Sequence, residues 1–186
     1  MKKAIVRLES RSPYSQSRFH GTEKLEKELA DDYERRTWKE KGHFGSDGIM
    51  FVPPTAISGS LKEAAKYLSM QVPGKGKTTY TKHFEAGVLI TEPLPIGYTR
   101  DTISENWVYA NADGVKGSGK RVMRCFPTVH EWAGTVEYLI LDEIITLPVF
   151  EKVLETAGTL IGIGQFRPRN GGYFGRYKGT ITEWVD

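Results

Sequence analysis

The residues with the clearest chemical character lie in a glycine-rich stretch late in the chain, IGIGQFRPRNGGYFGRY at 161–177. It contains five glycines, three arginines, four aromatic residues and no acidic residue. Arginine presents forked donors that suit phosphate oxygens, glycine-rich loops can turn backbone amides toward anions, and aromatic rings stack on unpaired bases. The composition therefore predicts a surface that binds a negatively charged polymer. Gly162 and Gly164 are expected to end a helix and to leave backbone amides facing outward.

The net charge of +3 conceals an uneven distribution along the chain. Three segments without acidic residues, 70–82, 114–124 and 162–179, hold 11 of the 26 lysines and arginines, so the rest has 15 basic residues against 23 acidic ones. This pattern indicates a nucleic-acid site if the segments converge in space; three solvated loops are the alternative. The residues expected at the site are Lys75, Lys77, Lys82, Lys116, Lys120, Arg121, Gly162, Gly164, Phe166, Arg167, Arg169, Gly171, Gly172, Tyr173 and Arg176.

Other chemistries find less support in the sequence. The run PGKGKTTY at 73–80 ends like a nucleotide-binding phosphate loop, but Gln71 stands where that loop needs its first glycine. One cysteine and four histidines give no recognised metal spacing, and Cys125 is expected to be a buried structural thiol. We therefore expect no catalytic residue, no metal and no cofactor. If the protein were an enzyme, His83 or His20 would be the candidate general base.

The elements that must position these residues can be read from periodicity. Alternation predicts a strand at 2–9, and short strand-like runs predict others at 49–53, 83–91, 135–142 and 180–185. The runs NWVYANA at 106–112 and RVMRCFPTV at 121–129 flank a GVKGSGK turn and predict a long hairpin. A helix is expected in SGSLKEAAKYL, 58–68, where Ser60 and Glu63 have the spacing of a capping box. A second helix is expected to open at Thr146 and Pro148 and to run to the glycine-rich stretch.

This order of elements predicts an α+β fold with a ferredoxin-like (RRM-like) core, in which two helices cover one face of an antiparallel sheet. The chain is expected to form a single domain, 1–186, with insertions at 10–47 and 92–134. No apolar run is long enough for a membrane span, the N-terminus lacks the features of a signal peptide, and the single cysteine fits a reducing cytoplasm.

Two segments resemble a known family, the RAMP superfamily of CRISPR proteins. They are the basic glycine-rich loop between the second helix and the last strand, and FVPPTAISGSLKEAAKYL at 51–68, which looks like the strand, small-residue turn and helix of that family. The order of elements is most similar to the backbone subunits that assemble along guide RNA. The resemblance implies that Gly162, Gly164, Arg167, Arg169, Gly171, Gly172 and Gly175 form an RNA-facing loop. It also implies that 10–47 and 106–129 grip the strand. The chain further looks like small proteins of tailed phages.

The sequence therefore favours a non-catalytic protein that binds single-stranded nucleic acid, RNA by resemblance, with possible self-assembly along the strand or contact with CRISPR complex components. Two alternatives stay open. One is a metal-independent endoribonuclease of the same superfamily. The other is a phage-encoded inhibitor whose basic segments dock on a host protein complex.

Overall fold

The computed structural model describes residues 1–112, 115, 117 and 119–186. Its centre is an antiparallel sheet in the strand order β4-β8-β1-β9. These strands are β1 (Lys2–Ser10), β4 (Val88–Leu89), β8 (Ala133–Ile140) and β9 (Tyr177–Val185). In β1, the alternating residues Ala4, Val6 and Leu8 are fully buried, because strand geometry sends every second side chain to the same face.

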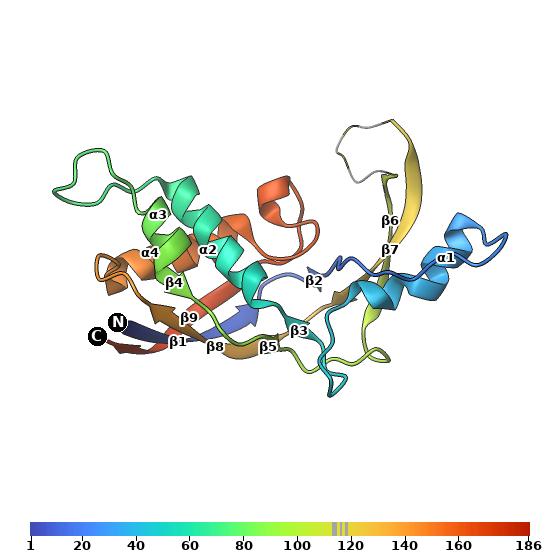
Figure 1. Cartoon of the computed structure of the whole chain (residues 1–186), viewed down its shortest axis with the longest axis horizontal. Helices are drawn as coiled ribbons and strands as arrows, with labels where there is room; N and C mark the ends of the chain where they lie inside the picture. Colours follow the sequence, from blue (N-terminus) through green and yellow to red (C-terminus); the bar gives the residue numbers. More distant parts are fainter. Residues whose placement is uncertain (113–114, 116, 118) are drawn as a thin grey trace.

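Three helices cover one face of this sheet, as Figure 1 shows: α2 (Pro54–Leu68), α3 (Thr81–Gly87) and α4 (Leu147–Thr156). Their apolar stripes form the core with the sheet, and Phe150 of α4 meets Tyr138 of β8 edge to face at 5.3 Å. A π-helical turn, Ala157–Ile161, extends α4 toward the glycine-rich stretch. Among the described residues, no helix combines the length and apolar character needed to cross a membrane.

A second sheet, in the order β2-β7-β6, projects from this body as a long hairpin (Figure 1). It consists of β2 (Tyr14–Ser15), β6 (Ser104–Asn111) and β7 (Arg121–Val129). Helix α1 (Ala30–Thr37) and a following 3-10 turn, Trp38–Lys41, lie beside β7. The short strands β3 (Phe51–Val52) and β5 (Leu94–Pro95) pair with each other. The two insertions expected from the sequence thus supply most of the projecting part.

The predicted α+β class, the hairpin and the strands at both ends of the chain are confirmed. The order of the main sheet is compatible with a ferredoxin-like core, which stays a prediction at that level of detail. Of the strand expected at 49–53, Phe51 and Val52 form β3, which in the described part of the chain pairs with β5 and not with the main sheet. The strand expected at 83–91 is mostly wrong. Its first half is α3, where Tyr80 and Phe84 lie one helical turn apart and are both buried, and only two residues continue as β4.

The predicted capping box is also wrong. Helix α2 begins at Pro54, whose fixed φ suits the first helical turn, so Ser60 lies in the helix interior. The Ser60 hydroxyl is fully buried, donates to the Ala157 carbonyl oxygen at 3.1 Å and accepts from the Tyr177 hydroxyl at 3.1 Å. It therefore joins α2 to the turn after α4 and to β9.

Candidate nucleic-acid interface

A groove of about 750 Å³ separates the glycine-rich stretch from the hairpin, and we call it the loop–hairpin groove. Residues 109–112, Arg121, Arg124 and Phe126 line it from the hairpin, and residues 164–166 and 170–172 line it from the loop. Ser17 and Lys41 complete the lining. In Figure 1 strands β6 and β7 rise opposite the loop that precedes β9. The structure thus brings part of two of the three basic segments to one concave surface.

The backbone amides of the glycine-rich stretch are largely used inside the protein. The amide of Gly162 donates to the Ala157 carbonyl oxygen at 2.8 Å, and that of Gly175 donates to the Pro13 carbonyl oxygen at 2.7 Å. Gly171 and Gly172 donate to carbonyl oxygens within the loop. The expectation that Gly162 offers an outward amide is therefore wrong, and these glycines do not form an open anion-binding nest.

The glycines are instead required by close backbone packing. Gly175 has φ +78°, and a Cβ there would lie 1.8 Å from the Ile163 carbonyl oxygen. At Gly172 a Cβ would lie 1.8 Å from the Phe166 carbonyl oxygen. Only glycine tolerates both the left-handed conformation and the contact at position 175. The loop is consequently a compact, fixed wall of the groove.

Aromatic side chains line both sides of the groove. Phe166 of the loop meets Phe126 of β7 edge to face, with ring centroids 5.3 Å apart. Tyr109 of β6 projects from the hairpin with 65% of its surface exposed. Amide side chains lie nearby on Asn111 and Asn170. This combination can stack on an unpaired base and hydrogen-bond to its edge.

A buried carboxylate fixes the cationic wall of the groove. Glu34 of α1 is 2% exposed and accepts hydrogen bonds from Lys41 at 2.6 Å, from Arg124 at 2.7 Å and from the Cys125 backbone amide at 3.0 Å. Lys41 also donates to the Cys125 carbonyl oxygen at 2.8 Å. Side chains of α1 and of the turn that follows it thereby form hydrogen bonds with backbone groups at the outer edge of β7. These groups would otherwise need a neighbouring strand as their partner.

The same contacts set the charge state of Glu34. Burial alone would raise its pKa, but the hydrogen bonds from Cys125, Lys41 and Arg124 outweigh that effect and lower the pKa from the usual value. Glu34 is therefore ionised at neutral pH and neutralises part of the charge of its two partners. The second terminal nitrogen of Arg124 donates to the Ala112 carbonyl oxygen at 3.2 Å, so the exposed Arg121 is the guanidinium most open to a ligand in the groove.

Two arginines predicted for the site point elsewhere. Arg167 and Arg169 form ion pairs with Glu63 of α2, at 3.0 and 3.2 Å. Neither lines the groove. Because both cations share one carboxylate, their main visible role is to attach the glycine-rich loop to α2.

Arg176 and Tyr173 also lie outside the groove lining. The Arg176 guanidinium donates to the backbone carbonyl oxygens of Thr159 and Tyr173 and lies over the Tyr173 ring at 5.9 Å. Tyr173 is 62% exposed, whereas Tyr177 is 1% exposed and belongs to the core. Arg176 thus stabilises the loop and the end of α4.

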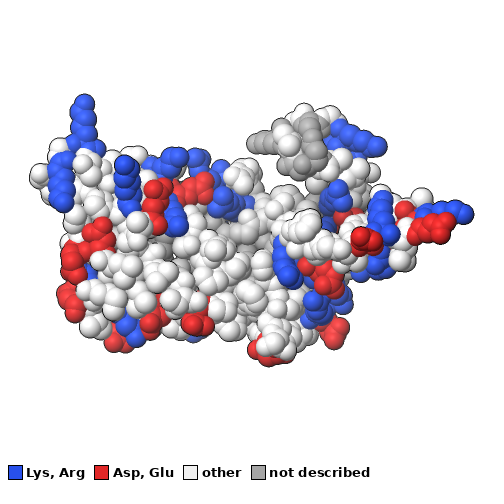
Figure 2. Space-filling view, viewed as in Figure 1, with Lys and Arg blue, Asp and Glu red and all other residues white. Residues whose placement is uncertain are grey.

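The three basic segments do not converge. Lys75 and Lys77 lie in the loop between α2 and α3, at the opposite end of the molecule from the hairpin in Figure 1, and blue atoms mark that end in Figure 2. Lys82 lies on α3 of the same end. The hairpin segment contributes Arg121 to the groove and an exposed Lys120 beside it, while Lys116 lies outside the described residues.

Sequence reasoning missed several groove residues, notably Lys41, Tyr109, Arg124 and the amide side chains of Asn111 and Asn170. Arg124 was counted among the basic segments, and the alternation in β6 could have marked Tyr109 as surface-facing. No comparable sequence feature marks Lys41 as a groove residue, because its position depends on a contact with Cys125, which lies far along the chain.

The histidines and the cysteine give no metal site within the described part of the chain, where no group of three or more ligand-type side chains was found. Burial raises the pKa of the Cys125 thiol to about 11, which makes it unreactive. One histidine contacts a carboxylate, as a general base in an enzyme often does: His83 Nδ1 lies 2.6 Å from Asp142 Oδ2. Burial tends to raise the pKa of Asp142, but hydrogen bonds from His83 and the Ile144 amide lower it below the usual value.

No family model and no curated protein matches this chain. Among solved structures, it is similar to a chain of a type III-B Cmr-β complex, determined by cryo-electron microscopy with cognate target RNA bound. The TM-score is 0.50 at 12% sequence identity, and the match covers 100% of this chain and 61% of the other. At that identity the similarity shows a shared fold, and this chain spans less than two thirds of its neighbour's length.

Proposed function

We propose that this protein binds single-stranded nucleic acid, RNA in preference to DNA, in the loop–hairpin groove. The observation that carries the proposal is the groove lining, in which Arg121 and Arg124 lie beside Tyr109, Phe166 and side-chain amides. Guanidinium groups neutralise phosphates, and exposed rings stack on bases at about 1–3 kcal/mol per base. The RNA preference rests on the fold shared with a chain of an RNA-bound complex.

The test is fluorescence anisotropy with one labelled ten-nucleotide sequence, made as RNA and as DNA. The Tyr109→Ala/Arg121→Ala variant should bind RNA at least tenfold more weakly than the wild type, because it loses one stacking platform and one exposed cation. Wild-type affinity should fall by about 0.7 log units per log unit of salt for each phosphate neutralised.

The matched control is Arg167→Ala/Arg169→Ala, which removes the same number of side chains, and more positive charge, from outside the groove. Its affinity should stay within about threefold of the wild type, since both arginines are paired with Glu63. Equal losses in the two variants, or an affinity insensitive to salt, would contradict the groove as the binding site. Thermal unfolding of each variant separates lost binding from lost structure.

The shared fold also supports, as partners, components of an RNA-bound complex. A separate proposal is that further copies of this chain assemble along one strand. Sedimentation of the protein with RNA of increasing length tests the second of these. Complexes whose protein content rises with RNA length would support assembly along the strand.

A second candidate function, metal-independent RNA cleavage, is favoured by the short contact between His83 and Asp142. Asp142 would hold Nδ1 protonated and leave Nε2 to take the proton of a ribose 2′-hydroxyl. That oxygen would attack the adjacent phosphorus, and the 5′-oxygen would leave with a proton, giving a 2′,3′-cyclic phosphate. The charge of Lys75, which also helps to lower the pKa of Asp142, would stabilise the phosphorane.

The test is incubation of structured RNA with the protein in a chelating buffer. Cleavage by the wild type that is lost in His83→Ala and kept in His130→Ala would establish this activity. Intact RNA with the wild type would leave the protein as a non-catalytic binder.

A further inference from the structure

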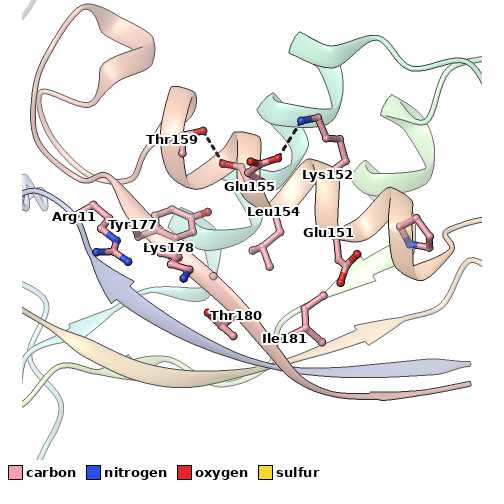
Figure 3. A pocket seen from close by; sticks show the side chains of 12 residues that line it. Arg11, Glu151, Lys152, Leu154, Glu155, Thr159, Tyr177, Lys178, Thr180 and Ile181 are labelled. Atoms are coloured by element: carbon pink, nitrogen blue, oxygen red, sulfur yellow. Dashed lines mark hydrogen bonds and ion pairs between the residues drawn. The ribbon is translucent and has the colours of Figure 1, made fainter.

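A second groove, of about 870 Å³, lies between α4 and β9, away from the loop–hairpin groove, and we call it the β9 groove. Its floor contains the apolar side chains of Leu154, Ile181 and Pro148, together with the edge of Tyr177. Figure 3 shows α4 above β9, with the two elements separating toward Glu151 and Ile181. No part of the proposed nucleic-acid binding uses this surface.

The groove opens because the helix is held close to the strand at one end only. A Cβ at Gly158 would lie 2.0 Å from the Tyr177 carbonyl oxygen, and one at Gly179 would lie 2.7 Å from the Leu154 side chain. The glycines thus permit contact between the end of α4 and the start of β9. Farther along, at Pro148 and Ile181, helix and strand diverge and leave apolar surface uncovered.

One wall of this groove is a strand with an unpaired edge. In the described part of the chain, β9 pairs with β1 on one side and with no strand on the other. An unpaired strand presents backbone N–H and C=O groups that another extended chain can bind. A bulge at Thr182, between the pairs Val6–Ile181 and Ile5–Glu183, interrupts the regular register. Because Gly158 packs against the Tyr177 carbonyl oxygen, the regular portion available to an added strand is the short run 178–181.

The rim of the groove is charged unequally at its two ends. Arg11 and Lys178 lie together at one end, and neither side chain forms an ion pair within the described residues. Glu151 lies at the other end and points toward Ile181 in Figure 3. Lys152, between these ends, is paired with Glu155 at 3.0 Å. The ligand that fits is negatively charged where it meets Arg11 and Lys178.

We propose that the β9 groove binds an extended peptide segment of a partner protein, which adds to the outer edge of β9 as a further strand. The segment places an acidic side chain against Arg11 and Lys178 and an apolar one on Pro148 and Ile181. Strand addition draws affinity from main-chain hydrogen bonds and specificity from pockets for alternate side chains. The unpaired edge, the apolar floor and the two unpaired cations each supply one of these requirements.

The experiment selects peptides from a displayed library of random twelve-residue sequences on the immobilised full-length protein. Enriched peptides should alternate in hydrophobicity and carry an acidic residue near one end. Their affinity, measured by anisotropy, should fall at least tenfold for Arg11→Glu/Lys178→Glu. It should be unchanged for Lys66→Glu/Lys77→Glu, which makes the same change in charge on exposed lysines of other elements.

N-methylation of single peptide bonds in the selected peptide distinguishes strand addition from other modes. Loss of affinity should recur at every second position, because alternate residues of an added strand point their amides toward β9. The proposal is overturned if no peptide is enriched, if enriched peptides bind the Arg11/Lys178 variant as well as the wild type, or if the N-methyl effect does not alternate. A parallel measurement with the labelled RNA keeps this result separate from the proposed function. The peptide-binding proposal is also overturned if the Arg11/Lys178 changes reduce the affinity for RNA and leave the affinity for the peptide unchanged.

Discussion

Glu34 organises a surface that it does not itself line. Its carboxylate lies beneath the loop–hairpin groove and holds Lys41, Arg124 and the backbone of β7 at fixed positions. A buried ion that loses its partner is costly, typically about 3–5 kcal/mol, because the remaining charges stay buried without compensation. The geometry of the cationic wall therefore depends on one acidic residue of α1.

We predict that Glu34→Gln lowers the free energy of unfolding by about 3 kcal/mol at pH 7. Because the folded pKa of Glu34 lies below its usual value of 4.5, its contribution is present above that value and is lost as the pH falls through the folded pKa. Urea unfolding at pH 7 and at lower pH should show the gap between wild type and variant closing on acidification. Glu155→Gln, which breaks an exposed pair, should cost less than about 1 kcal/mol. A pH-independent gap would contradict this role.

Composition picked out several residues that line the groove but could not give the direction in which each side chain points. Whether these residues bind nucleic acid stays a prediction. Phe166, Gly164, Gly171, Gly172 and Arg121 do line the groove. The arginines at 167 and 169 were indistinguishable from groove residues in sequence. Their pairing with Glu63 depends on which side of the loop faces α2, and that is a tertiary feature.

At the scale of elements, the glycine-rich loop acts as a rigid wall whose shape is set by backbone packing. Its internal hydrogen bonds, such as that from the Ile163 amide to the Gly175 carbonyl oxygen, close the loop on itself. The sequence predicted the strands of the hairpin because two strand-like runs flank a glycine-rich turn, and the structure extends them to eight and nine residues. It misassigned 83–91, where a seven-residue helix and a two-residue strand are each too short to show a period.

We predict that Gly175→Ala destabilises the protein by more than about 2 kcal/mol, because it combines a left-handed backbone with a backbone contact that a Cβ cannot avoid. Gly171→Ala is the matched control: φ there is +80°, yet no atom lies within 4 Å of the added Cβ. It should cost only about 1 kcal/mol, the strain of the backbone alone. Thermal or urea unfolding compares the two; equal costs would show that the contact at 175 relaxes.

For the whole molecule, the two ends carry separate basic surfaces. The loop that bears Lys75 and Lys77 lies at one end and the loop–hairpin groove toward the other (Figures 1 and 2). Exposed charges separated by more than about 8 Å are largely screened at physiological salt. The sequence showed three basic segments but could not show their separation, because convergence depends on where the fold places each loop.

We therefore predict that Lys75→Ala/Lys77→Ala leaves the affinity for a six-nucleotide RNA unchanged, within about twofold, at physiological salt. Lys120→Ala/Arg121→Ala, an equal change of charge at the hairpin, should weaken it several-fold. Anisotropy titrations of the short RNA provide the measurement. If the two double variants lose affinity equally, a short strand contacts both ends and the separation of the surfaces has no functional meaning.

The register of β1 has a consequence for how the chain is made. β1 precedes its partners along the chain: β8 begins at Ala133, and β9 pairs Val185 with Lys3. Until β8 and β9 emerge from the ribosome, the apolar face of Ala4, Val6 and Leu8 has no sheet to join. Formation of the main sheet therefore waits for β9 to be synthesised, as pairings distant in sequence require. Proteolysis of ribosome-bound chains stalled before and after β9 should show protection of β1 only in the longer ones.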